Sequence, residues 1–76
     1  MQATVYTTPT CPYCTMTKRY LKEKGVSFAE VDVSVDQRAA QTLFEKTGQM
    51  GVPVTQAGDD FVVGYDPKGL DRLLGL

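Results

Sequence analysis

The sequence predicts one α/β domain with the element order β-α-β-α-β-β-α. Three observations lead to this prediction. The chain has 76 residues, fewer than the roughly 100–150 of a typical domain, so residues 1–76 are expected to form a single domain. Its composition, 42% hydrophobic and 22% charged, is that of a globular protein rather than a disordered one. Short β-favouring runs alternate with segments that carry apolar residues at helical spacing.

The first strand and the first helix follow from local signals. The run Ala3–Thr7 favours a strand, and Thr8-Pro9-Thr10 favours a turn. A helix is expected to begin at Cys11 or Pro12, because proline suits the first helical position, and to end at Gly25. Its inward face would carry residues at helical spacing, namely Cys14, Thr17 and Leu21.

The second strand and the second helix come next. Apolar and polar residues alternate over Phe28–Val33, which predicts a half-buried strand. Ser34 and Gln37 have the spacing of a capping box, so the helix is expected to open at Ser34 and to stop at Gly48. One face of this helix would present Ala40, Leu43, Phe44 and Thr47.

The last third of the sequence predicts a hairpin and a helix. Residues 52–56 and 61–63 form two β-favouring runs, and the short connection 57–60 is rich in turn residues, so the two strands should be antiparallel. Asp66 is expected to cap the last helix, with Pro67 at its first position. Its inward side chains would be Leu70, Leu73 and Leu74.

This order of elements restricts the topology. The first β-α-β unit is expected to cross over in the right-handed sense, which makes its two strands parallel. The hairpin then completes a four-stranded mixed sheet, and helices on its faces bury the apolar side chains of a short chain. The sequence therefore predicts a minimal thioredoxin-like fold.

Charge and hydropathy exclude several classes of partner. The net charge of −1 and the pI of about 5.1 provide no broad basic surface, so we expect neither nucleic acid nor an anionic membrane as partner. No apolar run approaches the roughly 20 residues of a membrane span. Residues Met1–Val5 lack the basic start and the long apolar stretch of a signal peptide. We therefore expect a cytoplasmic protein, and a monomer.

The two cysteines are the most informative feature of the composition. A disulfide between Cys11 and Cys14 would close a loop of only a few residues and would constrain the unfolded chain little. The sequence contains no histidine and no other cysteine, so a tetrahedral zinc site lacks further soft ligands, and we expect no metal. The remaining interpretations are a redox dithiol and an incidental pair. A C-x-x-C at a strand-to-helix junction favours the redox dithiol.

The position of this pair gives each residue a chemical role. A thiolate attacks disulfides, and an ordinary thiol is only about 3% ionised at pH 7. Unpaired N–H groups at the start of a helix stabilise a negative sulfur at Cys11. Cys14 lies one turn further on and faces the core, so Cys11 is expected to be the attacking nucleophile and Cys14 the resolving thiol. Tyr13 is exposed between them and offers an aromatic surface to a bound thiol.

Three separated segments of this sequence resemble those of one family. Cys11-Pro12-Tyr13-Cys14, preceded by Tyr6-Thr7-Thr8-Pro9-Thr10, closely resembles the active-site segment of dithiol glutaredoxins. Thr47-Gly48-Gln49-Met50-Gly51-Val52-Pro53 is similar to their stretch that ends in Thr-Val-Pro. Gly64-Tyr65-Asp66 is similar to the turn before their last helix. The resemblance covers essentially the whole chain, in the same order.

The resemblance implies a thiol–disulfide oxidoreductase that works with glutathione and has no tightly bound cofactor. It implies a cis-proline at Pro53, where the alternative is an edge-strand proline, and a backbone contact of Val52 with the cysteinyl part of glutathione. It implies that Gly64, Tyr65 and Asp66 hold the γ-glutamyl end, although Asp66 also fits a plain N-cap. Gln49 is a further candidate contact, with a solvated surface position as its alternative.

Three departures from the family pattern favour another electron donor. Thr8 stands where many glutathione-binding members carry lysine, Met50 where an arginine is frequent, and Gly51 where the Thr of Thr-Val-Pro is expected. Each removes a polar contact or a positive charge that meets glutathione. The main alternative is therefore a redoxin that is recharged by thioredoxin reductase and serves ribonucleotide reductase or similar enzymes. In both cases the substrates include protein disulfides.

Two other classes and one charged segment complete the predictions. An iron–sulfur carrier would need two chains that each supply Cys11 with glutathione, and Pro12 disfavours it. A non-catalytic binding module would use the sheet edge at Val54, but it would have no need of two cysteines at this spacing. The basic cluster has two interpretations, a solvated helix face and a docking surface for an acidic partner; it consists of Lys18, Arg19, Lys22 and Lys24.

Overall fold

The computed structural model describes residues 2–48 and 51–76. Its seven elements have the predicted order β-α-β-α-β-β-α. The strands are β1 (Gln2–Thr7), β2 (Ser27–Asp32), β3 (Val54–Ala57) and β4 (Asp60–Val63). The helices are α1 (Pro12–Glu23), α2 (Gln37–Thr47) and α3 (Pro67–Leu74).

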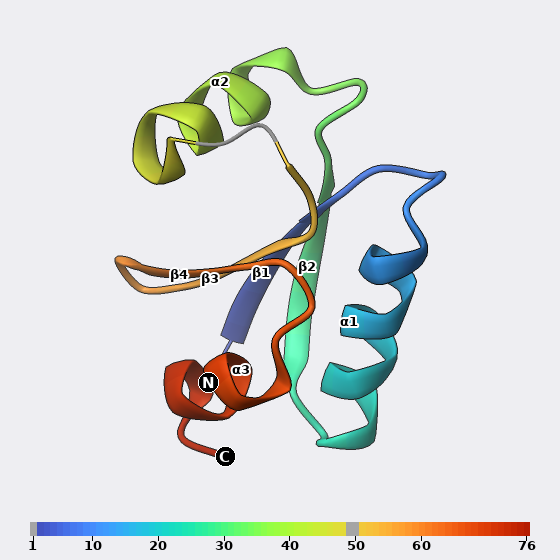
Figure 1. Cartoon of the computed structure of the whole chain (residues 1–76), viewed down its shortest axis with the longest axis vertical. Coiled ribbons are helices and arrows are strands. Elements are labelled where there is room, and N and C mark those ends of the chain that lie inside the picture. The colour runs from blue at the N-terminus through green and yellow to red at the C-terminus, as the bar shows by residue number, and fades with distance from the viewer. Residues whose placement is uncertain (1, 49–50) are drawn as a thin grey trace.

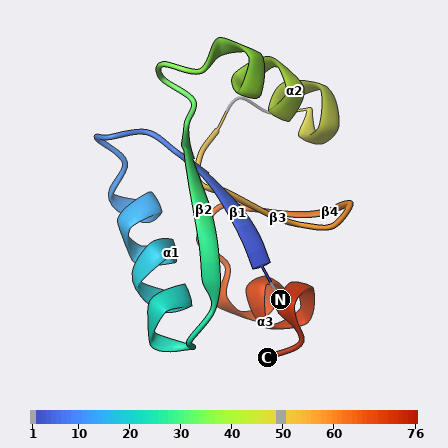
Figure 2. The same cartoon turned by 180° about the vertical axis from the view of Figure 1, so that it is seen from behind.

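The strands form one mixed sheet with the order β2-β1-β3-β4. β1 and β2 are parallel and in register from Gln2 opposite Ser27 to Thr7 opposite Asp32. β3 is antiparallel to both β1 and β4. α1 and α3 lie on one side of the sheet and α2 lies on the other (Figures 1 and 2). The predicted minimal thioredoxin-like fold, with helices on both faces of a four-stranded mixed sheet, is confirmed.

The core lies between the sheet and the helix pair α1 and α3. Ala3 and Val5 of β1 are buried against Leu21 of α1 and Leu74 of α3. The predicted inward face of α1 is confirmed, because Cys14, Thr17 and Leu21 are all buried. In α3, Leu70 and Leu74 are buried, and Leu73 packs against the core while remaining partly exposed.

The predicted start of α2 is wrong. The N-cap is Asp36 rather than Ser34, and its carboxylate accepts a hydrogen bond from the N–H of Ala39 at 3.0 Å. Ser34 instead donates to the carboxylate of Asp32 through its N–H, at 2.9 Å, and through its hydroxyl, at 2.5 Å. Asp32 at the end of β2 thus engages the side chain that would have capped the helix, and the chain makes a further turn before α2 begins.

The predicted inward face of α2 is only partly correct. Of the four side chains expected there, Leu43 is the one that is buried. Phe44 is 48% exposed, because it lies about 100° further around the helix than Leu43. α2 therefore covers its face of the sheet with a narrow apolar row.

The hairpin of β3 and β4 is confirmed, with a shift at its start. The strand begins at Val54, two residues later than predicted, because Pro53 has no N–H with which to join the sheet. Gly58 occupies the turn with φ of 61°, a left-handed conformation that glycine adopts without strain. Within residues 2–48 and 51–76, no helix is long and apolar enough to cross a membrane.

Candidate active site

The junction of β1 and α1 brings the two cysteines together. Of the two predicted starts, Cys11 and Pro12, the first residue of α1 is Pro12, and Cys11 is its N-cap. The sulfur of Cys11 accepts a hydrogen bond from the N–H of Cys14, with an N–S distance of 3.1 Å. The N–H of Cys11 donates to the carbonyl of Thr8 at 3.4 Å, which closes the turn that leads into the helix. A free N–H at a helix start thereby faces the Cys11 sulfur.

The two thiols have different environments. Both are free, and Cys11 is partly exposed whereas Cys14 is only 1% exposed. Burial raises the pKa of the Cys14 thiol to about 11, and the hydrogen bond to Cys11 acts in the same direction. A backbone hydrogen bond from Thr8 opposes this rise in pKa. At neutral pH, Cys14 is therefore a protonated thiol beneath an accessible Cys11.

The Val52-Pro53 segment lies directly against Cys11. The peptide bond between these residues is cis, as the family resemblance implied, and Pro53 is buried. The Cys11 thiol donates to the carbonyl of Val52 across an S–O distance of 3.8 Å. The N–H of Gly64 donates to the carbonyl of Pro53 at 2.7 Å, and Gly64 has a left-handed φ of 83°. The three sequence motifs thus meet in one place.

The other predicted site residues take different positions. Tyr13 is 59% exposed on α1, next to Cys11. Asp66 is the N-cap of α3, since its carboxylate accepts a hydrogen bond from the N–H of Gly69 at 3.1 Å. The ring of Tyr65 meets that of Tyr20 edge to face, with 6.4 Å between the centroids. Gln49 lies outside the described residues.

Tyr20 was not identified from the sequence, yet it connects the two helices on this side of the sheet. Its hydroxyl donates to the carboxylate of Asp71 in α3. This hydrogen bond, together with burial, raises the pKa of Tyr20 to about 12. Tyr20 and Asp71 are 51 positions apart, so no local pattern indicates their contact.

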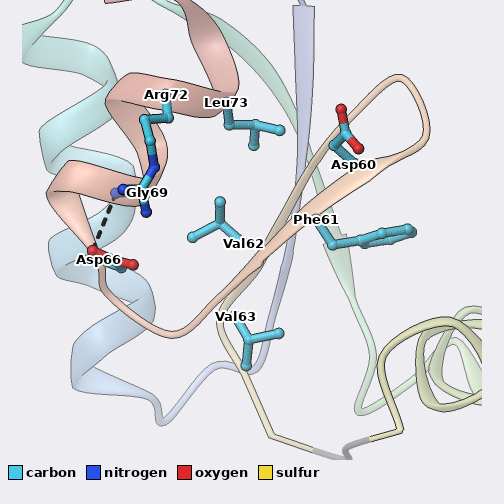
Figure 3. Close-up of a pocket in the computed structure, with 8 residues that line it drawn as sticks. All are labelled: Asp60, Phe61, Val62, Val63, Asp66, Gly69, Arg72 and Leu73. Atoms are coloured by element: carbon cyan, nitrogen blue, oxygen red, sulfur yellow. Dashed lines mark hydrogen bonds between the residues drawn. The ribbon is translucent and has the colours of Figure 1, made fainter.

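A groove of about 420 Å³ runs between the edge strand β4 and α3. In Figure 3, Val62 points toward α3, whereas Phe61 points to the opposite side of the strand. The groove shares Asp66 with the predicted site but contains neither cysteine; it is lined by Asp60, Phe61, Val62, Val63, Asp66, Gly69, Arg72 and Leu73. The groove is therefore separate from the surface around Cys11.

The described residues contain no group of three or more Cys, Asp or Glu side chains placed to hold a metal ion, and the sequence has no histidine. The free thiols of Cys11 and Cys14 are the nucleophilic side chains at the junction of β1 and α1. A partly exposed thiol with a buried thiol one turn away is an arrangement suited to thiol–disulfide exchange.

The sequence model of the Glutaredoxin family matches residues 3–62. The chain belongs to the glutaredoxin family. It is 37% identical to a glutaredoxin-like 8.6 kDa protein encoded in the rubredoxin operon of Clostridium pasteurianum, over 92% of this chain and 93% of that protein. It is also 37% identical to glutaredoxin 3 of Escherichia coli, over 92% of this chain and 93% of the relative.

A solved structure supports the same assignment. The glutaredoxin-like protein NrdH-redoxin from Escherichia coli, described as having a thioredoxin-like activity profile, superposes with a TM-score of 0.86 and 34% identity. The superposition covers 96% of this chain and 95% of that protein. This member of the glutaredoxin family is therefore a thiol–disulfide oxidoreductase, as its sequence predicts.

Proposed function

We propose that this glutaredoxin-like protein reduces disulfides of proteins and of small molecules with Cys11 as the attacking thiol and Cys14 as the resolving thiol. The observation that carries the proposal is the contrast between the two sulfurs. Cys11 is accessible and accepts the N–H of Cys14 at 3.1 Å, whereas Cys14 is buried. The accessible sulfur is the one that meets a substrate, and the donor stabilises its negative charge.

In the first step, the thiolate of Cys11 attacks one sulfur of the substrate disulfide. The substrate S–S bond breaks while a bond between Cys11 and that sulfur forms. The other substrate sulfur leaves as a thiolate and takes up a proton. The helix N-terminus favours the negative charge on Cys11 that this attack requires.

In the second step, Cys14 loses its proton and attacks the sulfur of Cys11. The mixed disulfide breaks, and the second substrate thiol is released. The substrate has then gained two electrons and two protons, and Cys11 and Cys14 are joined by a disulfide. No tightly bound cofactor or metal takes part in either step.

The Val52-Pro53 segment is the proposed contact for the substrate backbone, because the Val52 carbonyl lies 3.8 Å from the Cys11 sulfur. Tyr13 offers an exposed aromatic face beside it. We assign the γ-glutamyl end of glutathione to Gly64, Tyr65 and Asp66. The hydrogen bond from the N–H of Gly64 to the carbonyl of Pro53, at 2.7 Å, holds this turn beside the Val52-Pro53 segment. Gln49 remains a candidate contact for the rest of the tripeptide.

Glutathione is the proposed electron donor, with the cytoplasm as the place of action. Two glutathione molecules would reduce the Cys11–Cys14 disulfide by the same exchange steps in reverse order. The support is the Cys-Pro-Tyr-Cys and Gly-Tyr-Asp segments together with the likeness to glutaredoxin 3. The alternative donor is thioredoxin reductase, supported by the likeness to NrdH-redoxin and by Thr8 and Gly51.

A paired assay tests both the chemistry and the donor. The oxidised protein is mixed with NADPH and either glutathione plus glutathione reductase or thioredoxin reductase, and NADPH consumption is followed with a protein disulfide as the final acceptor. Turnover with glutathione supports the proposed donor. Turnover with thioredoxin reductase alone would replace that donor, and turnover with neither system would refute the oxidoreductase role of the dithiol.

A further inference from the structure

Half of the positive charges of the molecule lie on one short segment. Four of the eight lysines and arginines fall within residues 18–24, at the end of α1, and they are Lys18, Arg19, Lys22 and Lys24. With Glu23, this segment has a formal charge of +3, so the rest of the chain has a charge of −4. A molecule that is weakly acidic as a whole thus has one strongly basic helix end.

Much of this charge has no partner within the described residues. Lys18 forms an ion pair with Glu30 at 2.9 Å, and Lys24 lies over the ring of Tyr20 at 5.5 Å from its centroid. Arg19 and Lys22 are exposed, and neither forms an ion pair with any side chain in the described part of the chain. These two cations are therefore available to an anionic group from outside.

An apolar surface connects the reactive sulfur with these cations. Tyr13 and Met16, one helical turn apart on α1, are 59% and 41% exposed. Beyond them is a cavity of about 140 Å³, lined by Met16, Arg19, Tyr20, Glu23 and Tyr65. Its volume is several times the roughly 30 Å³ of a water molecule, so it has room for an aliphatic side chain.

The length of this surface determines the kind of substrate that can use it. With a rise of 1.5 Å per residue, Met16 lies about 8 Å along the helix from Cys11, and Arg19 and Lys22 lie about 12 and 16 Å away. An extended peptide spans about 3.5 Å per residue. A substrate must therefore continue for roughly two residues to reach Met16 and for four or five to reach the cations. Glutathione, with one residue on each side of its cysteine, is too short.

We propose that Tyr13, Met16, Arg19, Lys22 and Tyr65 form a docking surface for protein disulfides whose reactive cysteine is preceded by an aliphatic side chain and, further upstream, by carboxylates. An apolar centre with a charged rim is the usual construction of a protein interface. Opposite charges at the rim accelerate association. This inference rests on the proposed function of Cys11, and it names the class of protein substrate.

Two synthetic peptides test the docking surface. Each contains one internal disulfide, with leucine two residues before the reactive cysteine and either two glutamates or two lysines four and five residues before it. The fully reduced protein is mixed with each peptide in a single turnover, and the second-order rate is measured. At an ionic strength of about 0.01 M the glutamate peptide should react at least about tenfold faster. At about 1 M the ratio should fall below about threefold, because salt screens exposed charges.

Variants separate this surface from the chemistry. The double variant Arg19→Glu/Lys22→Glu should reverse the preference between the two peptides. Met16→Ala should slow the reaction of both leucine peptides severalfold. It should change the rates of peptides with serine in place of leucine much less. The matched control is Arg38→Glu/Lys46→Glu, which reverses two exposed charges on α2 and should leave the preference unchanged. All variants should reduce bis(2-hydroxyethyl) disulfide, a small neutral substrate, at the wild-type rate.

The outcomes distinguish the two levels of the proposal. Equal rates for the two peptides, with normal reduction of the small disulfide, would overturn the docking surface and leave the proposed function standing. Failure of the wild type to reduce the small disulfide would refute the proposed function itself, and the inference with it. Binding of duplex DNA or of phosphatidylserine vesicles that is lost in Arg19→Glu/Lys22→Glu, without a peptide preference, would assign the basic segment to another partner.

Discussion

The N–H of Cys14 donates a hydrogen bond to the sulfur of Cys11 at 3.1 Å, so the backbone of one cysteine stabilises negative charge on the side chain of the other. The spacing of three residues is that of an N-cap and the N–H it binds. The same spacing places the Cys14 side chain on the buried face of α1, beside Thr17 and Leu21. One turn of helix therefore produces both an accessible sulfur with a donor and a buried sulfur within reach of it.

This relationship predicts opposite behaviour for two serine variants. Cys11→Ser should lower disulfide reduction by at least about 100-fold, because the buried Cys14 cannot meet a substrate. Cys14→Ser should still attack, and with a protein disulfide it should accumulate a mixed disulfide at Cys11 that mass spectrometry detects. A mixed disulfide at Cys14 in the Cys11→Ser variant, formed at a comparable rate, would show that the roles are exchanged.

The pKa of Cys14 predicts that the reduced protein loses stability at alkaline pH. Because folding raises this pKa from 9.0 to about 11, the unfolded chain releases the proton first. The stabilisation from the neutral thiol is complete below about pH 9 and is lost as the pH rises to about 11. A difference of two pKa units corresponds to roughly 3 kcal/mol. Urea unfolding of the reduced protein at intervals between about pH 8 and 10.5 measures the part of this loss that falls below about pH 10.5.

A control variant assigns that loss to Cys14. The pKa of Tyr20 is also raised, to about 12. Tyr20 therefore also lowers the free energy of unfolding as the pH rises, at the upper end of this range. In Cys14→Ser, the free energy of unfolding should still fall slightly with pH because of Tyr20. The larger fall with pH, which we assign to Cys14, should be absent. An unchanged slope in Cys14→Ser would mean that another group is responsible.

Tyr20→Phe tests the connection between α1 and α3. The variant keeps the ring that contacts Tyr65 and removes the hydroxyl that donates to Asp71. We expect the free energy of unfolding at neutral pH to fall, since the substitution leaves the Asp71 carboxylate without this donor. Denaturant unfolding provides the measurement. Tyr13→Phe is the matched control and should change stability by less than about 0.5 kcal/mol, because Tyr13 is largely exposed.

Local signals explain why much of this fold could be predicted from the sequence. Pro12 at the first turn and the spacing of Cys14, Thr17 and Leu21 identify α1 without knowledge of its neighbours. Asp66 followed by Pro67 identifies the start of α3 in the same way. Each of these signals depends on residues within one or two helical turns, so the chain around them is not needed.

The features that could not be predicted depend on competition or on distance. Ser34 and Asp36 are both good N-cap residues, and the choice of Asp36 follows from the hydrogen bonds between Ser34 and Asp32. The meeting of Cys11 with Val52 joins residues 41 positions apart and was expected only from the family resemblance. The bond between Tyr20 and Asp71 has no signal in the sequence at all, because tertiary packing alone brings them together.

The contact between Asp66 and Gly69 predicts a non-additive pair of substitutions in α3. A Cβ atom at Gly69 would lie 2.6 Å from the Asp66 carboxylate and 3.3 Å from Val62, so Gly69→Ala must displace the cap. Gly69→Ala alone should destabilise the protein by about 1 kcal/mol or more, although alanine normally favours a helix. Asp66→Ala alone should also cost about 1 kcal/mol. In the double variant the second substitution should cost nearly nothing, because the cap it would displace is already absent. Urea unfolding of the four proteins gives the coupling energy, and additive losses would show that the Cβ clashes with Val62 rather than with the cap.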